Sequence, residues 1–266
     1  MSTRKFRYNL FVTLAVIISL VVVLGCGGSG SSGRSSTPAY GTGTGSGTGS
    51  GTGSGTGNSG GTGSGGSGGQ PGSSTQTLGG ASCSVFVPGS YSESTSTPLV
   101  IACHGSGGKP ADMTHFWQPV AESHGFILIA PSGTSANAEN IREDAKGLYN
   151  IAIKMCYVGG FSQGGIDSGS RALSSDNEKK WAAIFMLSSG FNPAPSACFQ
   201  NAAWKIPVYF SCGTSDSTFF SVVQSEHGYA EQAGHPAKLC TPNGGHQLSI
   251  HDYEDCWTWI SGHSSP

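Results

Sequence analysis

Ser162 is the residue of this chain whose surroundings most clearly favour nucleophilic chemistry. It lies at the centre of the sequence Gly-Phe-Ser-Gln-Gly, residues 160–164, directly after an apolar run over residues 155–159. The stretch that follows, residues 166–173, is compatible with a helix. A strand, a tight turn and a helix with a serine at the apex form a nucleophile elbow, in which glycines leave room for a strained backbone. The sequence therefore predicts an exposed serine hydroxyl at a sharp turn.

The pattern G-x-S-x-G occurs twice more in the chain, at residues 57–61 and 65–69. Both copies lie in a glycine-rich stretch without the apolar run or helix-forming residues that surround Ser162. A short motif carries chemistry only in the right structural context. Context therefore selects residues 160–164.

Two later loops contain residues that could activate this serine. Asp216 follows the apolar run 208–212 and the residues Gly-Thr-Ser, and His246 ends the sequence Asn-Gly-Gly-His after the run 237–240. Imidazole titrates near neutral pH and can take the serine proton, and a carboxylate on its other ring nitrogen fixes the tautomer. We therefore expect Ser162 to be the nucleophile, His246 the general base and Asp216 the residue that orients the base.

A third glycine-rich loop, residues 104–108, reads His-Gly-Ser-Gly-Gly and follows the apolar run 98–103. Its glycines allow backbone N–H groups to turn toward an anion. We expect the N–H groups of Ser106 and Gln163 to form an oxyanion hole, because Gln163 begins the helix that follows the nucleophile. His104 could instead serve as the base, but a histidine here is expected to brace the loop through hydrogen bonds.

Other residues near these loops have plainer explanations. Asp252 and Asp255 precede the last predicted helix, whose first turn favours carboxylates, so Asp216 is preferred as the acid. His251 lacks the Gly-Gly that precedes His246 and is expected at the surface. Aromatic residues near the loops could line an acyl pocket or belong to the core. These are Phe116, Trp117, Phe219 and Phe220.

The elements that must position these loops alternate along the chain. Their apolar runs lack polar alternation, which is typical of strands buried on both faces of a parallel sheet. The predicted strands cover residues 83–87, 99–103, 126–130, 155–160, 183–187, 208–212 and 237–239. The predicted helices cover residues 111–123, 163–173, 221–233 and 253–261. Ligands bind beyond the carboxyl ends of such strands, which is where the three loops follow.

Together, these motifs resemble those of α/β-hydrolases of the poly(3-hydroxybutyrate) depolymerase and feruloyl esterase group. The resemblance runs from about residue 83 to residue 260. It rests on the segments Val-Phe-Val-Pro at 85–88, His-Gly at 104–105, Gly-Phe-Ser-Gln-Gly-Gly at 160–165, Gly-Thr-Ser-Asp at 213–216 and Gly-Gly-His at 244–246. The serine motif is also similar to that of the phospholipase/carboxylesterase and acyl-protein thioesterase group. The resemblance implies an α/β-hydrolase fold, with a mostly parallel central sheet flanked by helices, and a triad in the chain order Ser, Asp, His.

The N-terminal residues 1–26 are typical of an export signal. Basic residues precede an apolar run over residues 10–24, which is short for a membrane span. The run ends in Val-Leu-Gly-Cys, which resembles the lipobox of bacterial lipoproteins, so we expect Cys26 to be lipidated. The alternatives are an ordinary signal peptide cleaved near Gly25 and an uncleaved anchor. In each case we expect the protein in the cell envelope, at the cell surface or secreted.

Composition divides the rest of the chain into two parts. Residues 27–77 are almost entirely Gly, Ser and Thr, which predicts a disordered linker with a reach on the order of 40 Å. Residues 78–266 fit one compact catalytic domain. The net charge of −2 provides no basic surface, so nucleic acid is not an expected partner.

Eight cysteines occur, and one of them is Cys26. In an oxidising compartment some should pair, and the odd remainder leaves at least one unpaired. Cys103, Cys156 and Cys212 lie in apolar runs and are expected in the core. The other cysteines could form two disulfides in any of three connectivities. These are Cys83, Cys198, Cys240 and Cys256, whose spacing does not favour a zinc site, and no metal or organic cofactor is implied.

These observations predict an exported serine hydrolase that cleaves carboxylic esters, in a polymer or a small molecule, through an acyl-enzyme intermediate. A peptidase of the same fold would use the same triad. A non-catalytic surface-binding protein on a hydrolase scaffold is the alternative from another class. Membrane contact is expected only through the N-terminal lipid.

Overall fold

The computed structural model describes residues 62–266 except for 135–136, 175–178 and 192–195. The predictions for the export signal, the lipid at Cys26 and the linker as far as residue 61 lie outside the described residues. Among the described residues, none of the helices combines the length and the apolar character that a membrane crossing requires.

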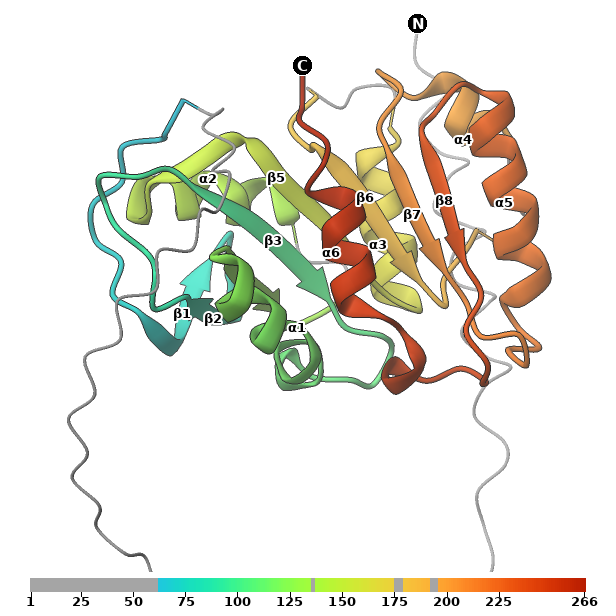
Figure 1. The fold of residues 1–266 in the computed structure, drawn as a ribbon, viewed down its shortest axis with the longest axis horizontal. Helices are drawn as coiled ribbons and strands as arrows, with labels where there is room; N and C mark the ends of the chain where they lie inside the picture. Colours follow the sequence, from blue (N-terminus) through green and yellow to red (C-terminus); the bar gives the residue numbers. More distant parts are fainter. Residues whose placement is uncertain (1–61, 135–136, 175–178, 192–195) are drawn as a thin grey trace, which may run out of the picture. The chain divides into compact units, whose positions relative to one another are not determined.

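The centre of the fold is an eight-stranded sheet with the strand order β1-β2-β4-β3-β5-β6-β7-β8 (Figure 1). The strands are β1 Gly72–Leu78, β2 Ala81–Val87, β3 Thr97–Cys103, β4 Ile127–Pro131, β5 Ile151–Phe161, β6 Ala183–Leu187, β7 Val208–Ser211 and β8 Ala237–Cys240. The pairs β1–β2 and β2–β4 are antiparallel, and the other pairs are parallel. The loops after β3, β5, β7 and β8 therefore meet at one edge of the sheet, as the sequence predicts.

Helices cover both faces of the sheet. They are α1 Pro110–His124, α2 Ala138–Leu148, α3 Gln163–Ala172, α4 Ser196–Asn201, α5 Phe220–Gln232 and α6 Tyr253–Ile260, with a short 3-10 helix over Leu248–Ile250. Helices α1 and α6 share one core with the sheet, in which Trp117 and Trp257 pack. Helices α2, α3 and α5 share the core on the other face, to which Ile141, Ala172 and Val223 belong. Figure 1 shows α6 in front of the sheet and α3 behind it.

All seven predicted strands and all four predicted helices are present, with ends shifted by a few residues. The elements β1, α2 and α4 were not predicted from the sequence. Strand β1 is polar and mostly exposed, so it lacks the apolar run that marked the other strands. It pairs with β2 through a turn in which Gly79 and Gly80 both have positive φ, 58° and 80°. Two residues with positive φ form the hairpin turn that matches the twist of paired strands.

The predicted linker boundary at residue 77 is wrong. Besides β1, residues from 63 onward hydrogen bond to the segment between α2 and β5. The hydroxyl of Ser64 donates to the carbonyl of Tyr149 at 2.7 Å, and the N–H of Gly68 donates to the carbonyl of Leu148 at 2.8 Å. The glycine-rich stretch thus joins the domain well before its composition changes, through backbone groups and the hydroxyl of Ser64.

The expectation that some of these cysteines pair is also wrong, because the seven described cysteines form no disulfide. Cys83 lies in β2 near one edge of the sheet, whereas Cys198 lies in α4, which packs on α5 near the other edge. Cys256 is fully buried in the core on the α1 and α6 face. The expectation that Cys103, Cys156 and Cys212 fill the core is confirmed.

Candidate active site

Ser162 lies at a strained turn between β5 and α3. Its φ is 52° and its ψ is −123°, which a non-glycine residue rarely adopts. The N–H of Ser162 donates to the carbonyl of Leu187 at 2.9 Å, so the turn is fixed to the end of β6. A Cβ added to Gly160 would lie 2.3 Å from the carbonyl oxygen of Cys103, and one added to Gly164 would lie 2.4 Å from that of His104. Both glycines are therefore required for the close approach of the backbones.

The structure brings the three predicted triad residues together. The Nε2 atom of His246 lies 3.0 Å from the Oγ atom of Ser162. The Nδ1 atom of His246 lies 2.7 Å from the Oδ2 atom of Asp216. These are hydrogen-bond distances, and they place the imidazole between the hydroxyl and the carboxylate. The arrangement can move a proton from the serine to the histidine while the carboxylate holds the ring.

Asp216 is almost fully buried, with a side chain that is 1% exposed. Its second oxygen, Oδ1, accepts the backbone N–H groups of Thr218 and Phe219, each at 3.1 Å. Burial by itself raises the pKa of Asp216, but the hydrogen bonds from His246 and from these two N–H groups outweigh it and lower the pKa below its usual value. The carboxylate therefore stays ionised and turned toward the imidazole.

His246 is more exposed than its partner, at 37% of its side chain. Two aromatic rings contact its imidazole, Phe161 at 4.7 Å and Phe219 at 5.2 Å between ring centroids. Phe219 thus lies beside the triad, which is consistent with the expectation that it could line an acyl pocket. Trp117 is instead fully buried in the core, and Phe116 stacks on Tyr253.

The loop after β3 lies directly against the nucleophile. A Cβ added to Gly105 would be 3.1 Å from the Cβ of Ser162. The loop turns at Gly107, whose φ is 74°, and the N–H of Gly108 closes the turn on the carbonyl of Gly105 at 3.0 Å. Within the described part of the chain, the N–H groups of Ser106 and Gln163 have no hydrogen-bond partner. The oxyanion role of these two groups stays a prediction.

His104 occupies both of its ring nitrogens with backbone partners. Its Nε2 atom accepts the N–H of Gly133 at 3.1 Å, so the proton is on Nδ1, which donates to the carbonyl of Gly105 at 2.8 Å. These bonds connect the loop after β3 to the loop after β4. The bracing interpretation of His104 is confirmed, and the ring is not placed to act on Ser162.

The prediction that His251 is a surface residue is wrong. Its relative exposure is 6%, and it hydrogen bonds to the hydroxyls of Ser188 and Ser211.

The two acidic residues that follow His251 lie at the start of the last helix, as expected, and take part in structural contacts. Asp252 caps α6 by accepting the N–H of Asp255 at 2.9 Å, and Asp255 in turn binds Lys238 at 2.6 Å.

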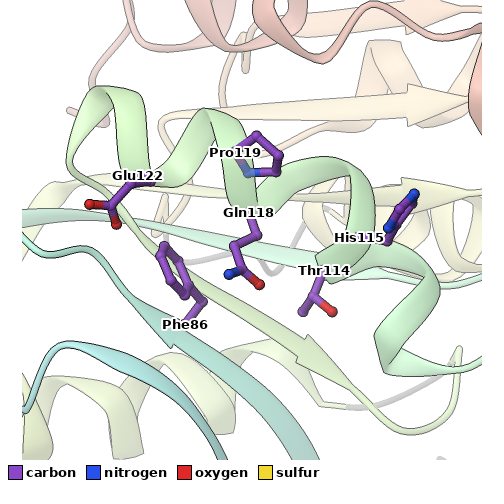
Figure 2. Close-up of a pocket in the computed structure, with 6 residues that line it drawn as sticks. All are labelled: Phe86, Thr114, His115, Gln118, Pro119 and Glu122. Atoms are coloured by element: carbon purple, nitrogen blue, oxygen red, sulfur yellow. The ribbon is translucent and has the colours of Figure 1, made fainter. Parts of the chain in front are cut away.

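A surface cavity of about 540 Å³ lies along α1, away from the triad residues, none of which lines it. Figure 2 shows Gln118 and Glu122 projecting from α1 above the ring of Phe86 in β2. Glu122 also accepts the N–H of Gly89 at 3.1 Å.

Among residues 62–266, leaving aside the gaps, no group of three His, Cys, Asp or Glu side chains is placed to hold a metal ion.

Comparisons with known proteins concern the fold and one partial relative. No family model matches the chain. The bifunctional acetylxylan esterase/xylanase XynS20E of Neocallimastix patriciarum is 29% identical over 136 residues, which are 45% of this chain and 19% of that protein. The match therefore spans about a fifth of the length of this relative.

Solved structures with the same fold include esterases and a serine hydrolase. FphF, a fluorophosphonate-binding serine hydrolase of Staphylococcus aureus, superimposes with a TM-score of 0.57 at 16% identity, over 72% of this chain and 99% of that one. A ferulic acid esterase gives a TM-score of 0.54 at 14% identity, over 71% and 97% of the two chains. An S-formylglutathione hydrolase of Agrobacterium tumefaciens gives 0.53 at 13% identity, over 71% and 93%. The chain thus has the α/β-hydrolase fold that its motifs predict.

Proposed function

We propose that this α/β-hydrolase is a serine esterase that cleaves carboxylic esters through an acyl-enzyme intermediate. The observation that carries the proposal is the hydrogen-bonded chain from Ser162 through His246 to the buried carboxylate of Asp216. All three positions are filled and in contact, which favours catalysis over a binding protein on an inactive scaffold. The esterase neighbours of the fold and the partial match to an acetylxylan esterase/xylanase support the choice of ester.

The first half of the reaction acylates the enzyme. His246 accepts the proton of the Ser162 hydroxyl as its oxygen attacks the ester carbonyl, and the carbonyl oxygen becomes an oxyanion. The N–H groups of Ser106 and Gln163 stabilise this charge, each worth about 10²–10³ in rate in comparable sites. His246 then gives its proton to the leaving alcohol as the tetrahedral intermediate collapses. Asp216 keeps its charge throughout and stabilises the imidazolium.

The second half releases the acid. His246 removes a proton from water, whose oxygen attacks the acyl carbonyl, and the same N–H groups bind the second oxyanion. Collapse of this intermediate returns the proton to Ser162 and frees the carboxylic acid. No other group is required for these steps, since the proton moves only between Ser162, His246, the alcohol and water.

The motifs favour substrates of the poly(3-hydroxybutyrate) depolymerase and feruloyl esterase type, that is, esters of hydroxyalkanoic or hydroxycinnamic acids. The experiment is hydrolysis of p-nitrophenyl esters of graded chain length, methyl ferulate and a hydroxybutyrate oligomer, with Ser162→Ala as the control. Loss of turnover by several orders of magnitude in a folded Ser162→Ala variant is expected. Full activity in that variant would overturn the mechanism.

Two further outcomes distinguish the alternatives. A folded protein that cleaves peptide amides faster than every ester would be a peptidase of the same fold. A protein that neither cleaves these substrates nor reacts with a fluorophosphonate would be the non-catalytic binding protein, because labelling requires an activated serine.

We also propose that the chain is an exported lipoprotein anchored through Cys26. The support is the apolar run that ends in Val-Leu-Gly-Cys. Metabolic labelling of a bacterial host with a fatty-acid analogue should modify the protein, and Cys26→Ala should abolish the label and release the protein from the membrane fraction. An unlabelled protein cleaved near Gly25 would indicate an ordinary signal peptide instead.

A further inference from the structure

His251 is buried near the triad and is bonded through both ring nitrogens. Its Nδ1 atom lies 2.8 Å from the hydroxyl of Ser211, and its Nε2 atom lies 3.3 Å from the hydroxyl of Ser188. Both serines are fully buried. A buried polar side chain with two buried polar partners is costly unless every bond is made, so this cluster has one preferred arrangement.

The two serines lie at the strand ends that support the triad. Ser188 follows β6 and has a φ of 42°, and Ser211 is the last residue of β7. The N–H of Ser188 donates to the carbonyl of Ser211 at 2.7 Å. The residue before Ser188, Leu187, accepts the N–H of Ser162. Ser188 thus follows the residue that binds the N–H of the nucleophile, and Ser211 precedes the loop that carries Asp216.

The ring of Phe161 connects His251 to the base. Its centroid lies 4.7 Å from that of His246 and 6.0 Å from that of His251. Phe161 directly precedes Ser162 and contacts His246. A shift of His251 against Phe161 would therefore change the positions of both Ser162 and His246. Close packing makes such contacts difficult to deform independently.

The loop that carries His246 is bonded on both sides of this residue, and on the C-terminal side the hydroxyl of Tyr253 donates to the carbonyl of Leu248 at 3.0 Å. On its N-terminal side, the N–H of Thr214 donates to the carbonyl of Pro242 at 2.9 Å, and that of Ser215 donates to the carbonyl of Gly244 at 2.8 Å. These bonds fix the loop to the segment of Asp216 before His246 is reached. After His246, the side-chain bonds of His251 fix it to the ends of β6 and β7.

Burial also determines the charge of the cluster. Desolvation and, to a smaller extent, the nearby His246 together lower the pKa of His251 from 6.5 to about 4, although Asp216 acts in the opposite direction. At neutral pH the imidazole is therefore uncharged, with one N–H donor and one acceptor nitrogen. Serine hydroxyls can donate or accept, so both bonds can be satisfied without a second buried charge.

We propose that His251 is a positioning residue, which anchors the loop of His246 to the carboxyl ends of β6 and β7 and thereby holds the Nε2 atom of His246 against Ser162. The inference rests on the proposed function, because it concerns the same triad. Misplacement of a catalytic group by about 1 Å can cost about 10² in rate. His251 touches no reacting atom, so its loss should affect turnover through geometry alone.

Three substitutions at this position separate packing from hydrogen bonding. His251→Leu fills the space without polar atoms, His251→Asn keeps an amide near the position of Nδ1, and His251→Gln keeps one near Nε2. We expect kcat for p-nitrophenyl acetate to fall by about tenfold to a hundredfold in His251→Leu, with KM within about twofold. His251→Asn should recover most of the loss, because the 2.8 Å bond to Ser211 is the shorter one, and His251→Gln should recover less.

His235 provides a matched control. It is 4% exposed, and its ring nitrogens lie 2.8 Å from the carbonyls of Ile206 and Phe199, away from the triad. His235→Leu should reduce the melting temperature but leave kcat per folded molecule unchanged. The rate at which a fluorophosphonate labels Ser162 gives a second readout, which should slow in His251→Leu in parallel with kcat.

Unchanged kcat and labelling in a folded His251→Leu variant would overturn the inference, as would an equal loss in His235→Leu or no recovery in His251→Asn. If His251→Leu does not fold, the inference is tested with His251→Asn and Ser211→Ala instead. Ser211→Ala removes the partner of the shorter bond and should lower kcat about threefold to tenfold. Failure of the proposed function is recognised separately, because the wild-type protein would then be neither active nor labelled.

Discussion

The ring of Phe219 is stacked on the imidazole of His246, with centroids 5.2 Å apart and planes inclined by 24°. An aromatic face attracts a cation within about 6 Å of its centroid. The imidazole becomes a cation when it takes the proton of Ser162, so this contact is stronger in the transition state than in the ground state. Phe219 follows Asp216 closely and donates its N–H to that carboxylate, which sets the ring in place.

The first prediction concerns this stacked pair. Phe219→Leu keeps an apolar side chain but removes the aromatic face, so kcat should fall by about threefold to tenfold. Phe219→Tyr retains the face and should stay close to the wild type. The measurement is kcat on p-nitrophenyl acetate at neutral pH. Equal kcat values for the leucine and tyrosine variants would show that the ring only fills space.

The second prediction concerns the acid. Asp216→Asn keeps the size of the side chain, but its amide group would face the Nδ1 atom of His246 and favour the wrong tautomer. In a comparable triad this change lowers kcat by about 10⁴, and a similar loss is expected here. Asp255→Asn is the control, since Asp255 binds Lys238 and Tyr209 and not a residue of the triad. Comparable losses in the two variants would argue against Asp216 as the orienting residue.

The sequence was sufficient to predict the elements that consist almost entirely of apolar residues. Strands such as β4 and β6 are buried at every position, so their unbroken apolar runs identified them. The triad could be assigned because each member follows a strand in the order that the fold requires. Helix α2 was missed although Asn137 caps it and buried residues recur at Ala138, Ile141 and Ala145, a helical spacing that could have been recognised.

Other features could not be found from the sequence because they depend on contacts between distant residues. The buried His251 hydrogen bonds to Ser188, which follows β6, and to Ser211, at the end of β7, and neither contact can be seen in the sequence. The cysteine count could suggest disulfides but not the positions of Cys83 and Cys198 near opposite edges of the sheet. Ser64 and its neighbours join the domain through hydrogen bonds to residues 148–151, which are distant in sequence and are not indicated by composition.

The third prediction compares two glycines. A Cβ at Gly160 would collide with the carbonyl oxygen of Cys103, which is backbone and cannot move aside, whereas a Cβ at Gly228 in α5 would meet nothing within 4 Å. Gly160→Ala should therefore destabilise the protein by more than about 3 kcal/mol or prevent folding. Gly228→Ala should stabilise it by about 0.5–1 kcal/mol, since alanine is the better helix former. Urea unfolding measures both, and a Gly160→Ala variant as stable as the wild type would contradict the tight elbow.

The fourth prediction concerns Glu226, a fully buried carboxyl group in α5. Its Oε1 atom accepts the N–H of Phe191 at 2.5 Å, and its Oε2 atom has no hydrogen-bond partner within the described residues. Burial raises the pKa of Glu226 from 4.5 to about 8. Its contribution to stability is therefore fully present below about pH 4.5 and is lost as the pH rises toward about 8, because the unfolded chain releases the proton first.

Glu226→Gln cannot ionise but can still accept the N–H of Phe191, so its stability should depend less on pH. The free energy of unfolding of the wild type should decline relative to that of Glu226→Gln by at most about 1.4 kcal/mol per pH unit between about pH 5 and pH 8. Glu231→Gln, an exposed position on the same helix, serves as the control and should follow the wild type. Urea unfolding at several pH values measures the difference. Parallel pH curves for the wild type and Glu226→Gln would mean that Glu226 is already ionised in the folded protein at neutral pH.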